Sequence, residues 1–482
     1  MADDHRMFID GSWVASESGV VFDAHSPSTG EVIGTVPEGT RQDARRAIAA
    51  AGDAWRGWAD RSAFDRAAAM RRVAEVVAGR RDDLARTLSL DQGKPLRAEA
   101  YDEVDELVAY FEMAGADATR LEGLMPPSVD GDKRILVYRV PRGVVGIITP
   151  WNWPYTMPAE IVAPALAVGN AVVWVPAPTT SVCAVKLAEC IVEADLPTGV
   201  FNMVTGPGPV VGDDVASNPG THAVGFIGSI ATGHQVAERA AGKELLLEMG
   251  GNGPLVILDD ANVDAAVTAT LEACFLNAGQ SCTAGERLLV QGAAHDDFLS
   301  RLEEATRRDI RLGDPFADET TMGPLNNEPT ADKTERHVGD AVERGAAVVL
   351  GGSRAPDRGS PLFYEATVLD GVTEEMEVAR EETFGPVVPV IRITSEDDAL
   401  RIANGSPYGL LTSVFTRDLH RGLRFAEAAR AGWVNINEGT NYWESHLPFG
   451  GGSRSRSGVG RVGGRFSMER LTELKTVVLN LG

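Results

Sequence analysis

The sequence predicts an α/β fold with a doubly wound parallel sheet and a second α/β domain. From residue 143 onward, short apolar runs alternate with segments of helical apolar spacing, which is the pattern of βαβ units. The chain has 482 residues, too many for one compact core. Its composition, 44% hydrophobic and 24% charged residues, is ordinary for a globular protein and excludes wholesale disorder.

Before residue 143 the sequence predicts a short β segment followed by helices. The β segment is expected at residues 7–14, and the helical period runs through 44–58, 64–77 and 101–113. The alternating region then has apolar runs at 144–148, 171–175, 201–204 and 223–227, with helices expected at 157–168, 180–194 and 231–241. Units of this kind form parallel strands that helices cover on both faces.

After the glycine pair at residues 250–251 the alternation resumes and predicts the second domain. Strands are expected at 255–258, 288–290, 347–350, 387–391, 413–415 and 432–436. A helix is expected at 263–278, and longer helical patterns extend to residue 344. The stretch 448–464 is rich in Gly, Ser and Arg and is expected to be a loop, whereas 476–479 returns to a β pattern.

Charge and cysteine content exclude several classes of function. The net charge of −24 repels phosphate backbones and anionic membranes, so we expect neither nucleic acid nor a membrane as a partner. Four cysteines in a chain of this length are no disulfide framework, and no Cys-x-x-Cys pair suggests a metal site. The N-terminal residues lack a signal-peptide pattern, and no apolar stretch is long enough to span a bilayer. We therefore expect a cytoplasmic protein that binds no metal.

Two glycine motifs differ in what they predict. The segment 228–233, which contains Gly228, Ser229 and Gly233, lies between an apolar run and a helical segment. It is similar to a P-loop without the lysine, so it could receive a phosphate at a helix N-terminus but not support nucleotide hydrolysis. A plain strand–helix turn is the alternative. The Gly-x-Gly-x-x-Gly at 458–463 lacks a preceding strand and is not expected to bind a cofactor.

Three residues point to chemistry at one site. Cys282 has small and polar neighbours, which leave its thiol accessible, and Glu248 ends an apolar strand, where burial raises a carboxyl pKa and suits a general base. Asn152 follows a strand at the edge of the sheet where ligands bind, and its amide can donate to an oxyanion. Taken singly, each has an ordinary alternative: an inert core cysteine, a solvated strand end and a turn residue.

Six motifs in a fixed order make the sequence resemble the aldehyde dehydrogenase superfamily over essentially the whole chain. They are Pro-Trp-Asn-Trp-Pro at 150–154, Phe-Ile-Gly-Ser at 226–229, Leu-Glu-Met-Gly-Gly at 247–251, Gly-Gln-Ser-Cys at 279–282, Glu-Glu-Thr-Phe-Gly-Pro at 381–386 and Leu-Pro-Phe-Gly-Gly at 447–451. The resemblance implies an aldehyde dehydrogenase-like fold and oxidation of an aldehyde to the carboxylic acid.

The resemblance also implies a role for each catalytic residue. Cys282 would add to the aldehyde carbonyl, and Asn152 with the Cys282 backbone N–H would hold the oxyanion of the thiohemiacetal. Glu248 would activate the water that hydrolyses the thioester, and its presence distinguishes the hydrolytic members from the CoA-acylating ones. The alternative is a catalytically retired homologue that binds or supports another molecule, although all three residues are present.

For the cofactor, the resemblance implies a site with one departure from the family pattern. Positions at the pyrophosphate and nicotinamide are matched by Trp151, Gly228, Ser229, Gly233, Glu382 and Phe384. After the strand at 171–174, however, the family usually has Lys-Pro-x-Glu, and this chain has Val-Pro-Ala-Pro at 175–178. The cofactor is therefore expected to be NAD or NADP, with NAD slightly preferred because no basic residue marks a 2′-phosphate pocket.

The family architecture implies a division of the chain and an oligomer. Residues 1–122 and 142–250 would form the cofactor-binding domain, 251–450 the catalytic domain, and 123–141 with 465–482 an oligomerisation extension. A β ribbon exposes strand edges unless a partner covers them, so a homodimer or homotetramer is expected.

By the same resemblance, the aldehyde tunnel would be lined by a short set of side chains near Cys282. They are Trp153, Met157, Glu160, Thr283, Trp443 and Phe449, with His446 nearby. Two tryptophans and a carboxylate could favour a cationic aldehyde. We favour an ordinary tunnel in which Glu160 points away or pairs with an arginine, because a desolvated carboxylate usually finds a protein partner.

Overall fold

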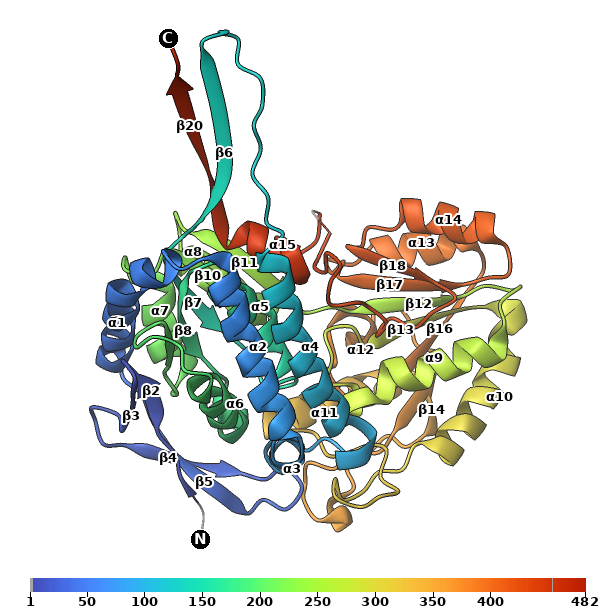
Figure 1. Ribbon diagram of the computed structural model, residues 1–482. Helices are drawn as coiled ribbons and strands as arrows, with labels where there is room; N and C mark the ends of the chain where they lie inside the picture. Colours follow the sequence, from blue (N-terminus) through green and yellow to red (C-terminus); the bar gives the residue numbers. More distant parts are fainter. Residues whose placement is uncertain (1–2, 453) are drawn as a thin grey trace.

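The computed structural model describes residues 3–452 and 454–482, and its strands form two large sheets, each with its own helices (Figure 1). Residues 1–2 lie outside the described part, and they belong to the N-terminal segment that lacks a signal-peptide pattern. Residue 453, in the expected 448–464 loop, also lies outside it. Both sheets contain antiparallel pairs at their edges but are parallel at their centres, which confirms the α/β fold with parallel sheets expected from the sequence.

The first sheet has eight strands in the order β19-β11-β10-β7-β8-β9-β2-β3. Its strands are β2 (Met7–Ile9), β3 (Ser12–Val14), β7 (Val144–Ile148), β8 (Ala171–Val175), β9 (Phe201–Met203), β10 (Ala223–Gly228), β11 (Glu244–Met249) and β19 (Gly458–Val459). The five central strands are parallel, while β2, β3 and β19 pair antiparallel. The chain runs from β7 outward to β9 and then returns to β10 on the other side of β7, so the sheet is doubly wound.

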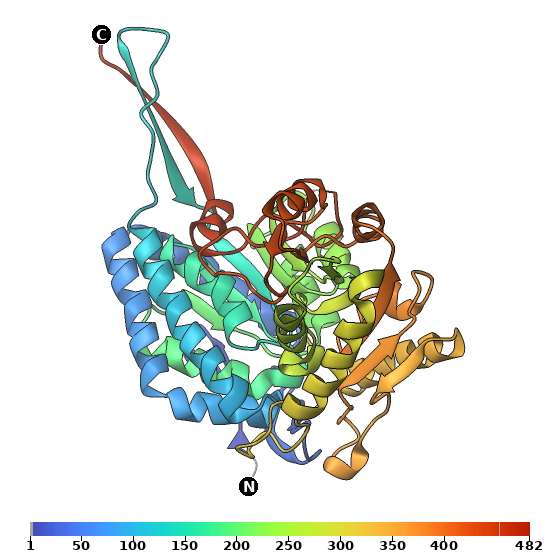
Figure 2. The ribbon, with the colours of Figure 1, turned by 90° about the vertical axis from the view of Figure 1, so that its right-hand side faces the viewer.

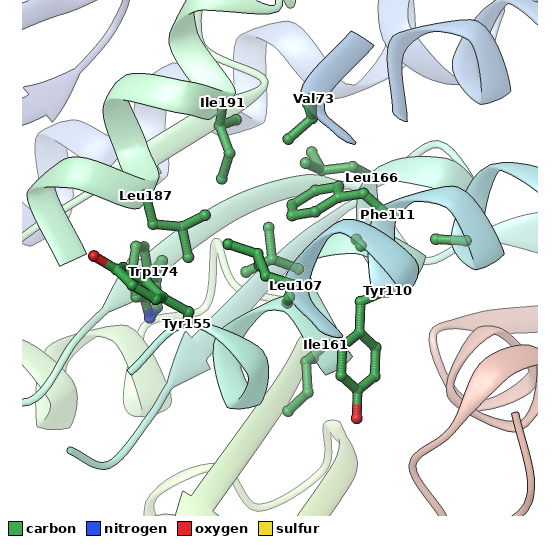
Figure 3. Packing of buried hydrophobic residues seen from close by; sticks show 14 of the residues in the cluster. Val73, Leu107, Tyr110, Phe111, Tyr155, Ile161, Leu166, Trp174, Leu187 and Ile191 are labelled. Carbon is green, nitrogen blue, oxygen red and sulfur yellow. The ribbon is translucent and has the colours of Figure 1, made fainter. Parts of the chain in front are cut away.

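Alternating side chains of these strands enter two separate cores. Val145 and Ile147 of β7 belong to the cluster that packs under α2 and α4–α6, while Val144 and the alternate residues of β8 pack against α1. Figure 3 shows part of the first cluster, in which side chains of α2, α4, α5 and α6 lie together with Trp174 of β8. The helices are α1 (Arg41–Ala59), α2 (Ala63–Gly79), α3 (Arg81–Asp91), α4 (Tyr101–Ala118), α5 (Thr156–Ala167), α6 (Ser181–Glu193), α7 (Asp213–Ser217), α8 (Ile230–Arg239) and α15 (Gly464–Arg470).

The second sheet has seven strands in the order β14-β15-β16-β13-β12-β17-β18. They are β12 (Gly253–Ile257), β13 (Gly285–Gln291), β14 (Ala347–Leu350), β15 (Thr367–Asp370), β16 (Val387–Ile393), β17 (Leu411–Phe415) and β18 (Trp433–Ile436). Only the β14–β15 pair is antiparallel among these described strands. The accompanying helices are α9 (Val263–Phe275), α10 (Gly292–Asp309), α11 (Glu328–Glu343), α12 (Glu377–Arg380), α13 (Glu396–Asn404) and α14 (Leu419–Ala428).

Two smaller β structures complete the fold. Near the N-terminus, β1 (Asp3–Asp4), β4 (Val21–His25) and β5 (Val32–Pro37) form a three-stranded sheet. Strand β6 (Lys133–Pro141) pairs antiparallel with β20 (Thr472–Asn480) along its whole length. Both views show this ribbon projecting away from the rest of the molecule (Figures 1 and 2). Within the described residues, no helix is long and apolar enough to cross a membrane.

Candidate active site

The segments at the carboxyl ends of the central strands of the first sheet contribute to one site together with residues of the second sheet's elements. The segment 150–154 follows β7, and Gly228 ends β10 with Ser229 directly after it, so both lie where the strand order reverses. In open α/β sheets, ligands bind outside the carboxyl ends of the strands at such a point. Two cavities open here, one of about 210 Å³ and one of about 170 Å³, and both are lined by Cys282, Glu248 and Met157.

The backbone around Cys282 is held in an unusual conformation. Asn277, Ala278 and Gly279 all have positive φ angles, and a Cβ on Gly279 would lie 2.1 Å from the Gly385 carbonyl oxygen. The Glu99 side chain fixes this turn, because its carboxyl oxygens accept from the Asn277 backbone N–H at 3.1 Å. Conformations of this kind persist only where the surroundings enforce them. The turn therefore presents the half-buried Cys282 at the junction of the two cavities.

The glycine pair after Glu248 provides the space that this cysteine segment occupies. A Cβ on Gly251 would lie 2.1 Å from the Cys282 carbonyl oxygen, so only glycine fits there. The Gly251 N–H also donates to Glu382 Oε1 at 2.9 Å. The Leu-Glu-Met-Gly-Gly motif thus joins Glu248, Cys282 and Glu382 through its backbone.

Glu248 is 3% exposed, and its Oε1 has no hydrogen-bond partner among the described residues. Burial raises the pKa of Glu248 well above its usual value, and the nearby carboxylates of Glu160 and Glu382 raise it further. Burial likewise raises the pKa of the Cys282 thiol, and the charge of Glu248 adds to that effect. A buried carboxyl with a free oxygen beside a thiol is suited to accept a proton.

Asn152 lines the smaller cavity together with this pair and is 2% exposed. Its side-chain Nδ2 donates one hydrogen bond to the Gln280 backbone carbonyl at 3.0 Å. The Asn152 backbone carbonyl accepts from Asn277 Nδ2 at 2.9 Å. An amide nitrogen has two hydrogens, so one remains for a further acceptor. The Cys282 backbone N–H makes no hydrogen bond within the described residues.

The smaller cavity contains five of the six residues predicted for the cofactor. Trp151 and Phe384 meet edge to face at 5.5 Å, and Gly228, Ser229 and Glu382 line the same space. Gly233 does not line it. Instead, Gly233 lets α8 pack on the sheet, since a Cβ there would lie 2.1 Å from the Met249 sulfur.

Local structure fits this cavity to a dinucleotide. The Ser229 hydroxyl caps α8 by accepting from the Thr232 N–H, which leaves the first N–H groups of the helix free for an anion such as a pyrophosphate. Gly228 has a φ of +157°, a conformation that side chains disfavour. The aromatic rings of Trp151 and Phe384 also line this cavity and could border a planar ring.

Two residues at this cavity were not predicted from the sequence: Glu286 supports its wall from behind, and Lys333 lines it. Glu286 accepts from the backbone N–H groups of Thr383 and Phe384 at 2.8 and 2.7 Å, which holds Phe384 at a positive φ. Lys333 of α11 lies 5.7 Å from the Phe384 ring centroid and opposes the rise in the pKa of Glu382, which burial brings to about 7. Nothing in the pattern around Glu286 or Lys333 distinguishes either from an ordinary strand or helix residue.

The larger cavity is lined by all six residues predicted for the aldehyde tunnel, and others join them. The predicted ones are Trp153, Met157, Glu160, Thr283, Trp443 and Phe449. Glu106 and Tyr110 of α4 complete one wall. The expectation that Glu160 points away or pairs with an arginine is wrong. It lines the cavity and accepts from the Tyr110 hydroxyl at 3.5 Å. His446 is exposed and lies 3.4 Å from Glu444.

Comparison with known proteins gives the same result from the family model and from individual relatives. The model described as "Aldehyde dehydrogenase family" matches residues 13–477. The chain is 38% identical to succinate-semialdehyde dehydrogenase (NADP(+)) GabD of Escherichia coli strain K12, covering 99% of this chain and 98% of that protein. It is also 38% identical to betaine aldehyde dehydrogenase of Bacillus subtilis strain 168, covering 98% and 97%. The crystal structure of an NAD-dependent aldehyde dehydrogenase from Sinorhizobium meliloti has a TM-score of 0.96 and 38% identity, covering 99% of this chain and 95% of that one.

Proposed function

This chain belongs to the aldehyde dehydrogenase family and is an NAD(P)-dependent aldehyde dehydrogenase, and from that premise we propose how its residues carry out the oxidation. Cys282 forms a thiohemiacetal with the aldehyde, this adduct becomes a thioester, and water activated by Glu248 releases the carboxylic acid. The observation that carries the proposal is that Cys282 and Glu248 line both cavities at their junction.

The first step is addition of the Cys282 sulfur to the carbonyl carbon. The thiol loses its proton, a C–S bond forms, and the carbonyl π electrons move to the oxygen. Burial raises the pKa of Cys282, but the side chain is only half-buried and lines the cavity, so the thiol proton passes to water there and Glu248 remains free for the later step. The remaining hydrogen of Asn152 Nδ2 and the Cys282 backbone N–H stabilise the new oxyanion.

The cofactor cavity would hold the dinucleotide against this adduct. Trp151 and Phe384 would border the nicotinamide end, Glu382 its ribose, and the capped N-terminus of α8 the pyrophosphate. Bound NAD or NADP would supply the hydride acceptor that turns the adduct into a Cys282 thioester. Oxyanion collapse and loss of hydride leave the carbon bonded to sulfur and doubly bonded to oxygen.

Glu248 then serves the second half of the reaction. Its carboxylate takes a proton from a water molecule as the water oxygen attacks the thioester carbon. The C–S bond breaks, the acid leaves, and the proton returns the sulfur to a thiol. The raised pKa of Glu248 makes it a stronger base than an exposed carboxylate, which supports this role.

Mixing the purified protein with NAD or NADP and a short neutral aldehyde such as butanal tests this proposal. We expect continuous growth of the absorbance band of the reduced nicotinamide, together with one carboxylic acid for each cofactor reduced. If a panel of neutral and charged aldehydes gives no reduced cofactor with either dinucleotide, the chain is a catalytically retired homologue instead.

We further propose the division of labour along the chain that its resemblance to the family suggests. Residues 1–122 and 142–250 bind the cofactor, 251–450 carry the nucleophile, and 123–141 with 465–482 join subunits. In support, β11 belongs to the first sheet and β12 to the second, so the sheets change between Met249 and Gly253. The extended β6–β20 ribbon supports a homodimer or homotetramer.

A further inference from the structure

The aldehyde cavity is unusually acidic for a space that binds a small organic molecule. Glu106, Glu160 and Glu248 all line it, and among its described lining residues there is no lysine, arginine or histidine. A cavity bordered by carboxyl groups of one sign concentrates the opposite charge. The charge of the cavity is therefore a guide to the charge of its substrate.

Glu160 is the more deeply placed of the two carboxyls that the proposed chemistry does not use. It lies on α5, is 6% exposed, and has the Tyr110 hydroxyl at 3.5 Å as its hydrogen-bond donor. The second carboxylate oxygen has no donor among the described residues. Figure 3 shows Tyr110 at the edge of the core, with its hydroxyl directed away from the labelled apolar side chains. A buried carboxyl held this way retains an open acceptor inside the cavity.

Glu106 faces the same space from α4 and forms no hydrogen bond or ion pair with any described residue. Its neighbour one helical turn earlier, Glu103, behaves differently, because it forms a buried ion pair with Lys94. Lys94 Nζ also lies 3.8 Å from the centroid of the Trp153 ring. Lys94 is thus already paired with Glu103 and lies against Trp153. It does not line the cavity, so it does not neutralise Glu106 or Glu160 from within.

Aromatic rings complete the environment that a cation prefers. Trp443 and Phe449 meet at 4.8 Å between centroids with an interplanar angle of 33°, and both line the cavity with Trp153. Aromatic faces attract cations through their quadrupoles, and the attraction grows when the site is desolvated. Carboxyl groups and aromatic rings here act in the same direction.

We propose that the substrate of this enzyme is an aldehyde carrying a positively charged nitrogen, held between Glu106, Glu160 and the aromatic rings that line the cavity while its carbonyl reaches Cys282. The inference rests on the proposed function and specifies its substrate class. An aldehyde with a terminal carboxylate would place an anion among carboxyl groups with no cation to receive it. Sequence similarity alone does not separate these classes, because the relatives named for succinate semialdehyde and betaine aldehyde are equally identical to this chain.

The titration of these carboxyls supports a pH-dependent preference. Burial raises the pKa of Glu160 to about 8, with the charge of Glu106 adding to it, and burial raises the pKa of Glu106 to about 7, with Glu103 adding and Lys94 opposing. Glu248, Cys282 and Tyr110 face the same space. Raised values mean that the carboxylates form only as the pH rises through 7 to 8. Preference for a cation over a neutral aldehyde should increase over that interval.

The test compares pairs of aldehydes that differ in charge but not in shape. Betaine aldehyde is matched by 3,3-dimethylbutanal, in which carbon replaces the charged nitrogen, and protonated 3-aminopropanal is matched by butanal. The first pair probes a quaternary ammonium and the second a primary one, and 4-oxobutanoate serves as the anion. The measured quantity is the ratio of kcat/KM for the cation to that for its neutral partner, at pH 7 and pH 8.5.

In the wild type we expect the ratio to rise with pH for at least one pair and 4-oxobutanoate to be the poorest substrate. Glu160→Gln should lower the ratio about tenfold, and the double variant with Glu106→Gln should lower it further, because each removes a charge that favours the cation. Glu112→Gln is the matched control, since Glu112 is an exposed residue of the same helix as Glu106 and does not line the cavity. It should leave the ratio unchanged.

Three results decide the matter. A ratio in the double variant within about threefold of the wild-type ratio for both pairs overturns the inference. Ready oxidation of neutral aldehydes without any preference for cations overturns it while leaving the proposed function intact, whereas no oxidation of any aldehyde overturns the proposed function itself. If the glutamine variants do not fold, inhibition of wild-type butanal oxidation by propylammonium replaces them: it should exceed inhibition by 1-propanol at pH 8.5, and equal inhibition contradicts the inference.

Discussion

The surroundings of Cys282 lead to a prediction about the reactivity of its thiol. Burial raises the pKa of Cys282, and Glu248 raises it further, so the thiolate fraction at a given pH is smaller than for an exposed cysteine. Glu248→Gln removes the negative charge. We therefore expect the pH profile of alkylation by iodoacetamide to shift to lower pH in this variant. A profile that is unchanged or shifts to higher pH would show that the two groups do not interact in this way.

Gly251 is predicted to be essential for a steric reason rather than a chemical one. A Cβ at this position would lie 2.1 Å from the Cys282 carbonyl oxygen, so Gly251→Ala must displace the nucleophile. We expect loss of most aldehyde oxidation with a destabilisation on the order of 1–3 kcal/mol. Gly339→Ala is the control, because that glycine lies within α11 and a Cβ there would contact nothing within 4 Å. Equal activity of both variants would contradict the packing argument.

The sequence singled out three candidate residues that the structure brings to one cavity, but it did not predict their surroundings. Cys282, Glu248 and Asn152 lie in motifs whose neighbours restrict what they can do. The carboxyl groups that surround the site were not predictable. Glu99, Glu106 and Glu286 come from distant elements, and each resembles a surface carboxylate in its local sequence pattern. Only the packing of α4 against α5 makes Glu106 and Tyr110 part of the cavity wall.

At the scale of elements, the turn between β8 and α6 leads to a prediction about the cofactor preference. Val175 is 2% exposed and packs in the core beside α1, while Pro178 is exposed at the start of a short 3-10 turn. A carboxylate placed here would accept from the ribose 2′-hydroxyl of NAD and repel the 2′-phosphate of NADP. Pro178→Glu should therefore raise the KM for NADP relative to that for NAD. A ratio unchanged within about twofold would mean that the adenosine is held elsewhere.

Most strands and helices were predictable because their apolar periods are regular. The runs expected at 144–148, 171–175 and 223–227 lie within β7, β8 and β10, each to within one residue of its bounds. Helix α3 (Arg81–Asp91) was not predicted, since its polar residues obscure the helical period. The expected strand at 7–14 is a hairpin, because Asp10 and Gly11 have positive φ and reverse the chain.

At the scale of the whole molecule, the β6–β20 ribbon is expected to hold subunits together. It exposes apolar side chains, with Leu474 62% and Val478 55% exposed, and β20 pairs only with β6 among the described strands. The double variant Leu474→Glu, Val478→Glu should reduce the mass measured by light scattering toward that of one subunit. Leu419→Glu, on α14 and 64% exposed, is the control and should leave the mass unchanged. A wild-type protein that is already monomeric would contradict the assignment of the ribbon.

The central claim is that Cys282 performs the oxidation and Glu248 is needed only to release the product. Rapid mixing of Glu248→Gln with cofactor and aldehyde measures this directly. The account predicts a burst of about one reduced cofactor for each active site followed by a stall, because the thioester forms but is not hydrolysed. Cys282→Ala should give neither burst nor turnover. Steady turnover of Glu248→Gln near the wild-type rate, or any burst from Cys282→Ala, would contradict the account.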